Sequence, residues 1–98
     1  MQLQVTPRHS GSRSTITLSG RVAGPVPRAG VVVELLVYYR GQWEPFRDPR
    51  ARGNGRFAVH YRFEGSIGRF PFRAEIPGGQ SGFPYSGGSS RPVAVETR

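Results

Sequence analysis

Apolar and polar residues alternate with a period of two along much of this chain, and this alternation is its strongest structural constraint. Residues 57–63 are the clearest case, because Phe, Val and Tyr occupy every second position and Ala, His and Arg occupy the others. Successive side chains of a β-strand point to opposite faces of a sheet. The alternation therefore predicts a strand with one buried face and one exposed face.

Seven segments of this kind are separated by Gly, Pro and Ser, and no segment has the period of a helix. They span residues 2–6, 15–22, 31–39, 42–47, 57–63, 70–76 and 92–97. Short alternating strands joined by turn residues are typical of an all-β, two-layer antiparallel β-sandwich. At 98 residues the chain has the length of one domain, so we expect a single domain over residues 1–98.

The apolar positions of these strands, together with eleven aromatic residues, are sufficient for one hydrophobic core. We expect strand 31–39 to be paired on both sides or covered by strand 42–47, because an open apolar edge promotes aggregation. The short link 64–68 predicts a hairpin between the strands that flank it. Ten residues are expected to be buried together: Phe57, Val59, Tyr61, Phe63, Phe70, Phe72, Ile16, Leu18, Leu35 and Val95.

The order of several short motifs suggests a family. Ser-Gly-Arg-Val at 19–22 precedes the valine-rich strand, which is followed by Arg-Gly-Gln-Trp at 40–43, Gly-Arg-Phe at 55–57, Phe-Pro-Tyr at 83–85 and Val-Ala-Val at 93–95. This order resembles the immunoglobulin-like modules of secreted and surface proteins of GC-rich actinobacteria, and the carboxypeptidase-regulatory, prealbumin-like group. The resemblance implies a Greek-key, immunoglobulin-like sandwich of about seven strands.

The same resemblance implies a structural, spacer or interaction module of an extracellular or cell-surface protein, whose signal peptide lies outside this sequence. Its expected partners are neighbouring domains of the same polypeptide or another protein, without membrane insertion. The chain has no Cys, so the Cys–Trp–Cys core of antibody domains is absent and Trp43 does not have that role.

Residues suited to catalysis are few and dispersed. Asp48 is the only aspartate, and His9 and His60 are the only histidines. A general base needs an oriented partner, and neither a nucleophile elbow nor zinc spacing is present. We expect no enzymatic activity, no metal and no cofactor.

All fourteen basic residues are Arg, and the net charge is +8. Because Arg has GC-rich codons, the bias has either a genomic or a functional origin. On the functional interpretation, the outer face of the expected hairpin and the loop before it bind an acidic polymer through bidentate Arg contacts. The alternative is a solvated face without a ligand. The candidate polyanion-binding residues are Arg47, Arg50, Arg52, Arg56, Arg62, Arg69 and Arg73.

Three aromatic residues lie where they are expected to be exposed. Trp43 follows a turn, and Phe83 and Tyr85 lie in a loop rich in Gly. Such residues stack on sugar rings in carbohydrate-binding modules, but they also plug the ends of sandwiches or pack against a neighbouring module. Few Asp, Asn or Gln residues stand near them to orient a sugar. Carbohydrate binding therefore remains a second alternative.

Overall fold

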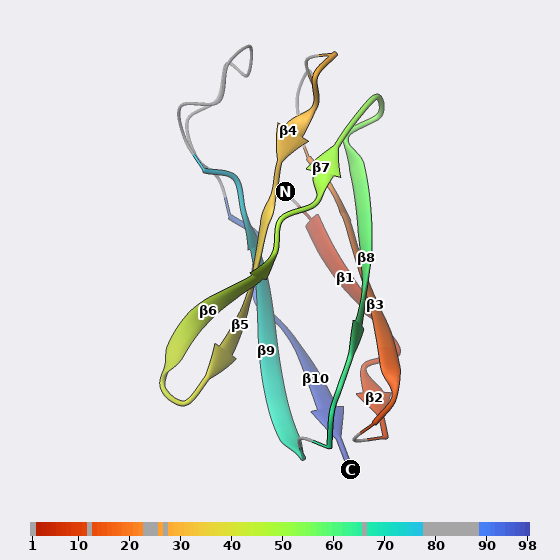
Figure 1. Cartoon of the computed structure of the whole chain (residues 1–98), viewed down its shortest axis with the longest axis vertical. Coiled ribbons are helices and arrows are strands. Elements are labelled where there is room, and N and C mark those ends of the chain that lie inside the picture. Colours follow the sequence, from red (N-terminus) through yellow and green to blue (C-terminus); the bar gives the residue numbers. More distant parts are fainter. Residues whose placement is uncertain (1, 12, 23–25, 27, 66, 78–88) are drawn as a thin grey trace.

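The computed structural model describes residues 2–11, 13–22, 26, 28–65, 67–77 and 89–98. These residues form ten β-strands and no helix. The molecule is elongated, with extents of 42 × 25 × 18 Å, and its longer strands follow the long axis (Figure 1). The all-β class predicted from the sequence is confirmed.

One sheet contains three antiparallel strands in the order β1-β3-β8. These strands are β1 (Gln2–Thr6), β3 (Thr15–Arg21) and β8 (Arg56–Arg62). Apolar residues alternate with polar residues in each of them, so the sheet has one face for the core and one for solvent.

The second sheet contains five strands in the order β2-β10-β9-β5-β6. They are β2 (His9–Ser10), β10 (Val93–Thr97), β9 (Gly68–Glu75), β5 (Glu34–Tyr39) and β6 (Gln42–Arg47). All pairs are antiparallel except β2 and β10, which are parallel. The prediction that the long apolar strand is paired on both sides is confirmed for Leu35, Leu36 and Val37, where β5 lies between β9 and β6.

The predicted strand 31–39 is interrupted at Val33. Its first part, β4 (Val31–Val32), pairs instead with β7 (Arg50–Ala51) in a small separate ladder. The Val33 amide donates to the carbonyl oxygen of Pro49 at 2.8 Å. This bond fixes the position of Val33 between β4 and β5. The tight turn predicted at Arg40 and Gly41 is confirmed, and both residues have positive φ, at 52° and 85°.

The predicted hairpin between residues 57–63 and 70–76 is wrong. Strand β8 pairs with β3, whereas β9 pairs with β10 and β5 in the other sheet. Both strands have a strongly aromatic face, and these faces pack against each other across the core. The ring centroids of Tyr61 and Phe72 are 5.9 Å apart, and those of Phe63 and Phe72 are 6.4 Å apart.

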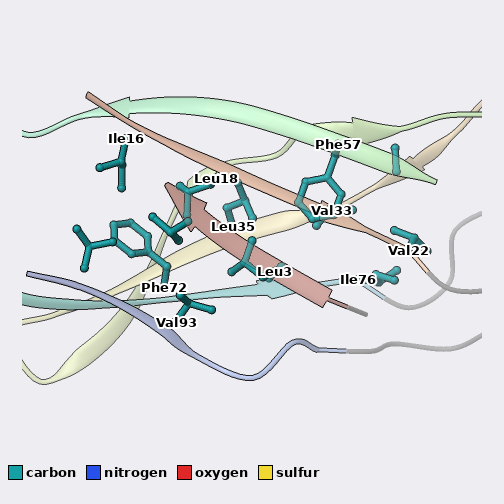
Figure 2. Packing of buried hydrophobic residues seen from close by; sticks show 14 of the residues in the cluster. Leu3, Ile16, Leu18, Val22, Val33, Leu35, Phe57, Phe72, Ile76 and Val93 are labelled. Carbon is teal, nitrogen blue, oxygen red and sulfur yellow. The ribbon is translucent and has the colours of Figure 1, made fainter. Parts of the chain in front are cut away.

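The hydrophobic core contains side chains from both larger sheets (Figure 2). Leu18 of β3, Leu35 of β5 and Phe72 of β9 are at most 1% exposed. Of the ten residues predicted to be buried, seven are buried, and Val59, Tyr61 and Phe70 are half-buried against the same cluster. The burial predicted for these ten positions is therefore confirmed in seven and partial in three.

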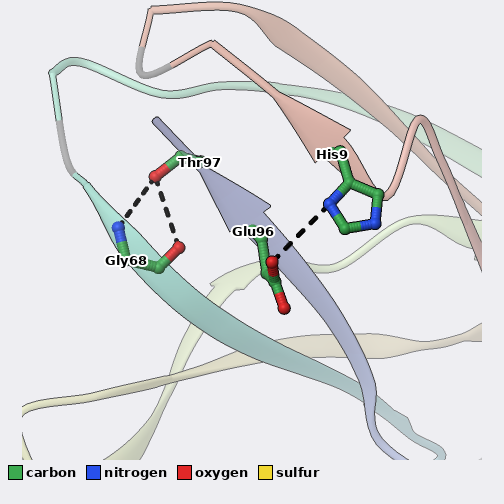
Figure 3. A network of polar contacts seen from close by, with 4 residues as sticks. All are labelled: His9, Gly68, Glu96 and Thr97. Carbon is green, nitrogen blue, oxygen red and sulfur yellow. Dashed lines mark hydrogen bonds and ion pairs between the residues drawn. The ribbon is translucent and has the colours of Figure 1, made fainter.

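Polar contacts join the ends of three strands in the five-stranded sheet (Figure 3). The Gly68 amide donates to the Thr97 hydroxyl at 3.0 Å, and this hydroxyl lies 3.4 Å from the Gly68 carbonyl oxygen. On the same sheet, His9 Nδ1 lies 3.6 Å from a carboxylate oxygen of Glu96. These contacts connect the start of β9, the end of β10 and the short strand β2.

Candidate functional site

The basic surface predicted from the sequence is divided between two sheets. Arg56 and Arg62 lie on β8 of the three-stranded sheet, whereas Arg69 and Arg73 lie on β9 of the five-stranded sheet. The prediction that these residues share the outer face of one hairpin is wrong, because that hairpin does not form. The two pairs of arginines have different surroundings.

On the five-stranded sheet, arginines alternate with carboxylates. Arg73 forms an ion pair with Glu75 at 2.7 Å, and its guanidinium lies 4.5 Å from the centroid of the Trp43 ring. Arg69 is the cross-strand neighbour of Glu96. Opposite charges on one face of a sheet attract each other, so Glu75 and Glu96 compensate the charges of Arg73 and Arg69.

Of the other three candidate arginines, Arg47 and Arg50 lie apart from both pairs, whereas Arg52 adjoins Arg56. Arg47 Nη1 donates to the Phe46 carbonyl, and Arg50 Nη1 donates to the Ala29 carbonyl, each at 3.0 Å. The backbone of Arg52 pairs with that of Arg56, so Arg52 adjoins the end of the three-stranded sheet.

The outer face of the three-stranded sheet contains arginine and neutral polar residues. We call it the arginine face. Its outward residues are Gln2, Gln4 and Thr6 of β1; Thr15, Thr17, Ser19 and Arg21 of β3; and Arg56, Ala58, His60 and Arg62 of β8. None of these described residues is Asp or Glu.

Arg21 and Arg56 lie directly opposite each other on this face. The neighbouring pair, Val22 and Gly55, is hydrogen-bonded, since the Val22 amide donates to the Gly55 carbonyl at 2.8 Å. Hydrogen-bonded and non-hydrogen-bonded pairs alternate along an antiparallel ladder, so Arg21 and Arg56 form a non-hydrogen-bonded pair. Side chains approach most closely in such pairs. Neither guanidinium forms an ion pair with a described carboxylate, and Arg21 Nε donates to the Asn54 carbonyl at 3.2 Å. Arg21 is not among the candidate residues predicted from the sequence, and it is the pairing of β3 with β8 that brings it beside Arg56.

An open depression of about 570 Å³ lies beside this arginine pair. Gln2 and Gln4 line it from β1, and the small residues Ser19 and Ala58 leave room within it. Guanidinium groups bind oxyanions in a bidentate manner, and glutamine amides donate further hydrogen bonds. The depression therefore has the chemistry of a site for phosphate, sulfate or carboxylate groups.

Gly20 lies at the base of this depression, where the absence of a side chain allows close packing. It lies opposite Phe57 in the ladder, on the core side. A Cβ atom at Gly20 would clash with the backbone carbonyl oxygen of Gln2 and lie 2.5 Å from the Phe57 ring, so any larger residue would displace both β1 and the ring. Packing of an aromatic ring over a cross-strand glycine is a known way to stabilise such a site in a sheet.

Comparison with known proteins identifies no relative. No protein-family model matches the chain, and neither a curated protein nor a solved structure matches it. Within the described ranges, no three His, Asp or Glu side chains gather as metal ligands, and no helix is long and apolar enough to cross a membrane. Function is therefore inferred from the chemistry of the surfaces.

Among the candidate sugar-binding aromatics, Trp43 is described and is half-buried. The Arg73 guanidinium lies over its ring, and Tyr38 packs against it edge to face, with centroids 5.3 Å apart. Part of the indole surface is therefore already used within the sheet. Phe83 and Tyr85 lie outside the described residues.

His60 is exposed on the arginine face, as its alternation with Val59 and Tyr61 predicts. Its Nδ1 atom lies 3.1 Å from the Thr17 hydroxyl, which is its cross-strand neighbour. This contact orients the imidazole along the face.

Proposed function

We propose that the chain is an immunoglobulin-like β-sandwich with Greek-key connections. The strand order supports this proposal: if β1, β3, β5, β8, β9 and β10 are assigned as A, B, C, E, F and G, the sheets pair as A–B–E and C–F–G. The connections from β3 to β5 and from β8 to β9 each pass from one sheet to the other, as Greek-key sandwiches require. Membership of a secreted or cell-surface protein rests on the motif resemblance in the sequence.

Within such a protein, we propose that the chain is a non-catalytic interaction module that binds acidic polymers through the arginine face. The observation that carries this proposal is the direct pairing of Arg21 with Arg56 beside the depression. Like charges opposite each other on a sheet are destabilising, and an anion bound between them removes the repulsion.

A polymer fits this face better than a single anion. Arg62 lies six residues beyond Arg56 on the same strand, so the two positions are about 20 Å apart at the rise of a β-strand. Arg21 and Arg56 then hold one anionic group, Gln2 and Gln4 donate hydrogen bonds to it, and Arg62 contacts a group further along the chain. Neutralisation of several anionic groups releases counterions, so affinity falls as salt rises.

The test compares two triple variants with the same net charge. We expect Arg21→Gln, Arg56→Gln and Arg62→Gln together to weaken binding to heparin and to reduce the slope of log affinity against log salt by about 2 to 3. The control replaces Arg40, Arg47 and Arg69 by Gln, which lie on the five-stranded sheet and its β5–β6 turn. Isothermal titration calorimetry at several NaCl concentrations measures both quantities.

Equal loss in the two triple variants would show that net charge alone attracts the polymer, and it would overturn the assignment of the site. Failure of the wild-type protein to bind heparin or polyphosphate at low salt would overturn the acidic-polymer function itself. Thermal unfolding of each variant serves as the control for folding, since all six arginines are exposed.

A further inference from the structure

A second hollow, of about 300 Å³, lies between the β5–β6 hairpin and β8. Strand β6 is an edge of the five-stranded sheet and β8 is an edge of the three-stranded sheet. The hairpin diverges from β8 toward its turn (Figure 1). Aromatic residues and one carboxylate line the hollow: Tyr39, Phe46, Tyr61, Phe63, Phe70 and Glu44.

The lining rings form a connected aromatic cluster. Phe46 and Tyr61 meet edge to face across the two sheets, with centroids 5.0 Å apart. Phe63 lies 5.5 Å from Phe70, and Phe70 lies 6.3 Å from Tyr39. Phe46, Tyr61 and Phe70 are only half-buried, so part of the aromatic surface remains accessible next to a well-packed core.

The charge around this hollow favours a cation. Among its lining side chains, all of them described, Glu44 is the only charged one, and its carboxylate is exposed. The faces of aromatic rings are negative and attract cations within about 6 Å of the ring centre. The chain itself already has such a contact, since the Arg40 guanidinium lies 5.2 Å from the Tyr39 ring centroid.

We propose that this hollow binds a quaternary ammonium group. Cations with N–H groups, such as ammonium or guanidinium, need hydrogen-bond acceptors, and the lining rings offer few of them. A quaternary ammonium has methyl groups and no N–H, so its charge meets ring faces and the Glu44 carboxylate without unsatisfied donors. The site lies apart from the arginine face, and its test does not depend on polyanion binding.

Choline and its neutral isostere 3,3-dimethylbutan-1-ol distinguish a cation site from an apolar cavity. We expect choline to shift the aromatic side-chain resonances of Phe46, Tyr61 and Phe70 in NMR titrations, and to bind about tenfold more tightly than the alcohol. Equal affinity for the two compounds, or no shift with choline, would overturn the proposal.

Two matched pairs of variants locate the site. We expect Glu44→Gln to weaken choline binding about fivefold, and Glu34→Gln, the same change on the outer face of β5, to leave it unchanged. Tyr39→Leu should weaken binding, whereas Tyr38→Leu should not, because these adjacent exposed tyrosines point to opposite faces of the strand. Equal affinities within either pair would contradict the assignment.

The quaternary ammonium group has two possible sources, a free small molecule and a phosphatidylcholine headgroup. Co-sedimentation with phosphatidylcholine vesicles that is lost in Glu44→Gln would identify the headgroup as the source. Choline binding without co-sedimentation would identify a free cation. Co-sedimentation that persists unchanged in Glu44→Gln would contradict a role of the hollow in headgroup binding.

Discussion

Ser90 secures one end of β9 through two hydrogen bonds. The Ala74 amide donates to the Ser90 hydroxyl at 2.9 Å, and the Ser90 amide donates to the Ala74 carbonyl at 2.8 Å. Both residues are buried. The pairing of β9 with β10 ends at Phe72 and Val93, so Ser90 supplies partners just beyond the regular ladder.

We expect Ser90→Ala to lower the free energy of unfolding by about 1 to 3 kcal/mol, because the Ala74 amide would then be buried without an acceptor. Ser89→Ala, at the exposed neighbouring position, should change it by less than about 0.5 kcal/mol. Urea denaturation followed by circular dichroism measures both values. Similar losses in the two variants would indicate that the hydroxyl of Ser90 has no special role.

At the scale of single residues, the sequence predicted which side of a strand a residue occupies, but not what lies beside it. Arg62 and Arg73 follow the same alternation, and both were placed on polar faces. In the fold, Arg73 has Glu75 and Trp43 as neighbours, whereas Arg62 faces Thr15. Glu75 lies two residues away on the same strand, but Trp43 and Thr15 come from strands far apart in the chain. Alternation within one strand carries no information about these two neighbours.

Strand β8 has one bonded edge and one open edge. The Phe63 amide donates to the Ser14 carbonyl at 3.1 Å. This bond determines which residues of β8 are hydrogen-bonded to β3. Every second residue from Phe63 back to Phe57 therefore bonds to β3, and the backbone groups of Ala58, His60 and Arg62 point away from it. No described strand pairs with β8 on that side.

Amide hydrogen exchange should reproduce this alternation. We expect slow exchange at Val59 and Tyr61 and fast exchange at Ala58 and His60, because only the first two amides bond to β3. Leu35 to Val37 of β5, which is paired on both sides, should exchange slowly. The opposite alternation along β8 would show that its register with β3 is shifted by one residue.

All seven predicted segments form strands, although residues 31–39 form two, because an alternating pattern of four or more residues is a local signal. The two-residue strands β2 and β7 are too short to produce one, and the break at Val33 depends on a bond to the distant Pro49. The prediction of a hairpin is wrong because a link as short as residues 64–68 permits either a turn within one sheet or a crossing between sheets. The burial of two aromatic faces against each other favours the crossing.

At the scale of the whole molecule, Phe72 connects the two sheets. Its side chain is 1% exposed, and its ring lies 5.7 Å from Phe46, 5.9 Å from Tyr61 and 6.4 Å from Phe63. We expect Phe72→Ala to lower the free energy of unfolding by about 3 to 5 kcal/mol. Chemical denaturation measures this loss, which is a large part of the stability of a small domain.

Ile67→Ala is the control for this variant, because Ile67 is 73% exposed. It should change the free energy of unfolding by less than about 0.5 kcal/mol. A loss below about 1 kcal/mol in Phe72→Ala would mean that the sheets do not share one core. The apolar content of the sequence predicted that a core exists, but the contacts between strands β6, β8 and β9 arise only from the topology.

The unequal distribution of carboxylates predicts one preferred orientation of the molecule when it binds to an anionic surface. Glu34, Glu75 and Glu96 all lie on the outer face of the five-stranded sheet, whereas the described residues of β1, β3 and β8 on the opposite outer face are cationic or neutral. Even the shortest dimension of the molecule, 18 Å, exceeds the screening length of about 8 Å in physiological salt. A nearby layer of anions therefore attracts one face and barely influences the other. The protein then lies with β1, β3 and β8 toward that layer and Trp43 toward solvent.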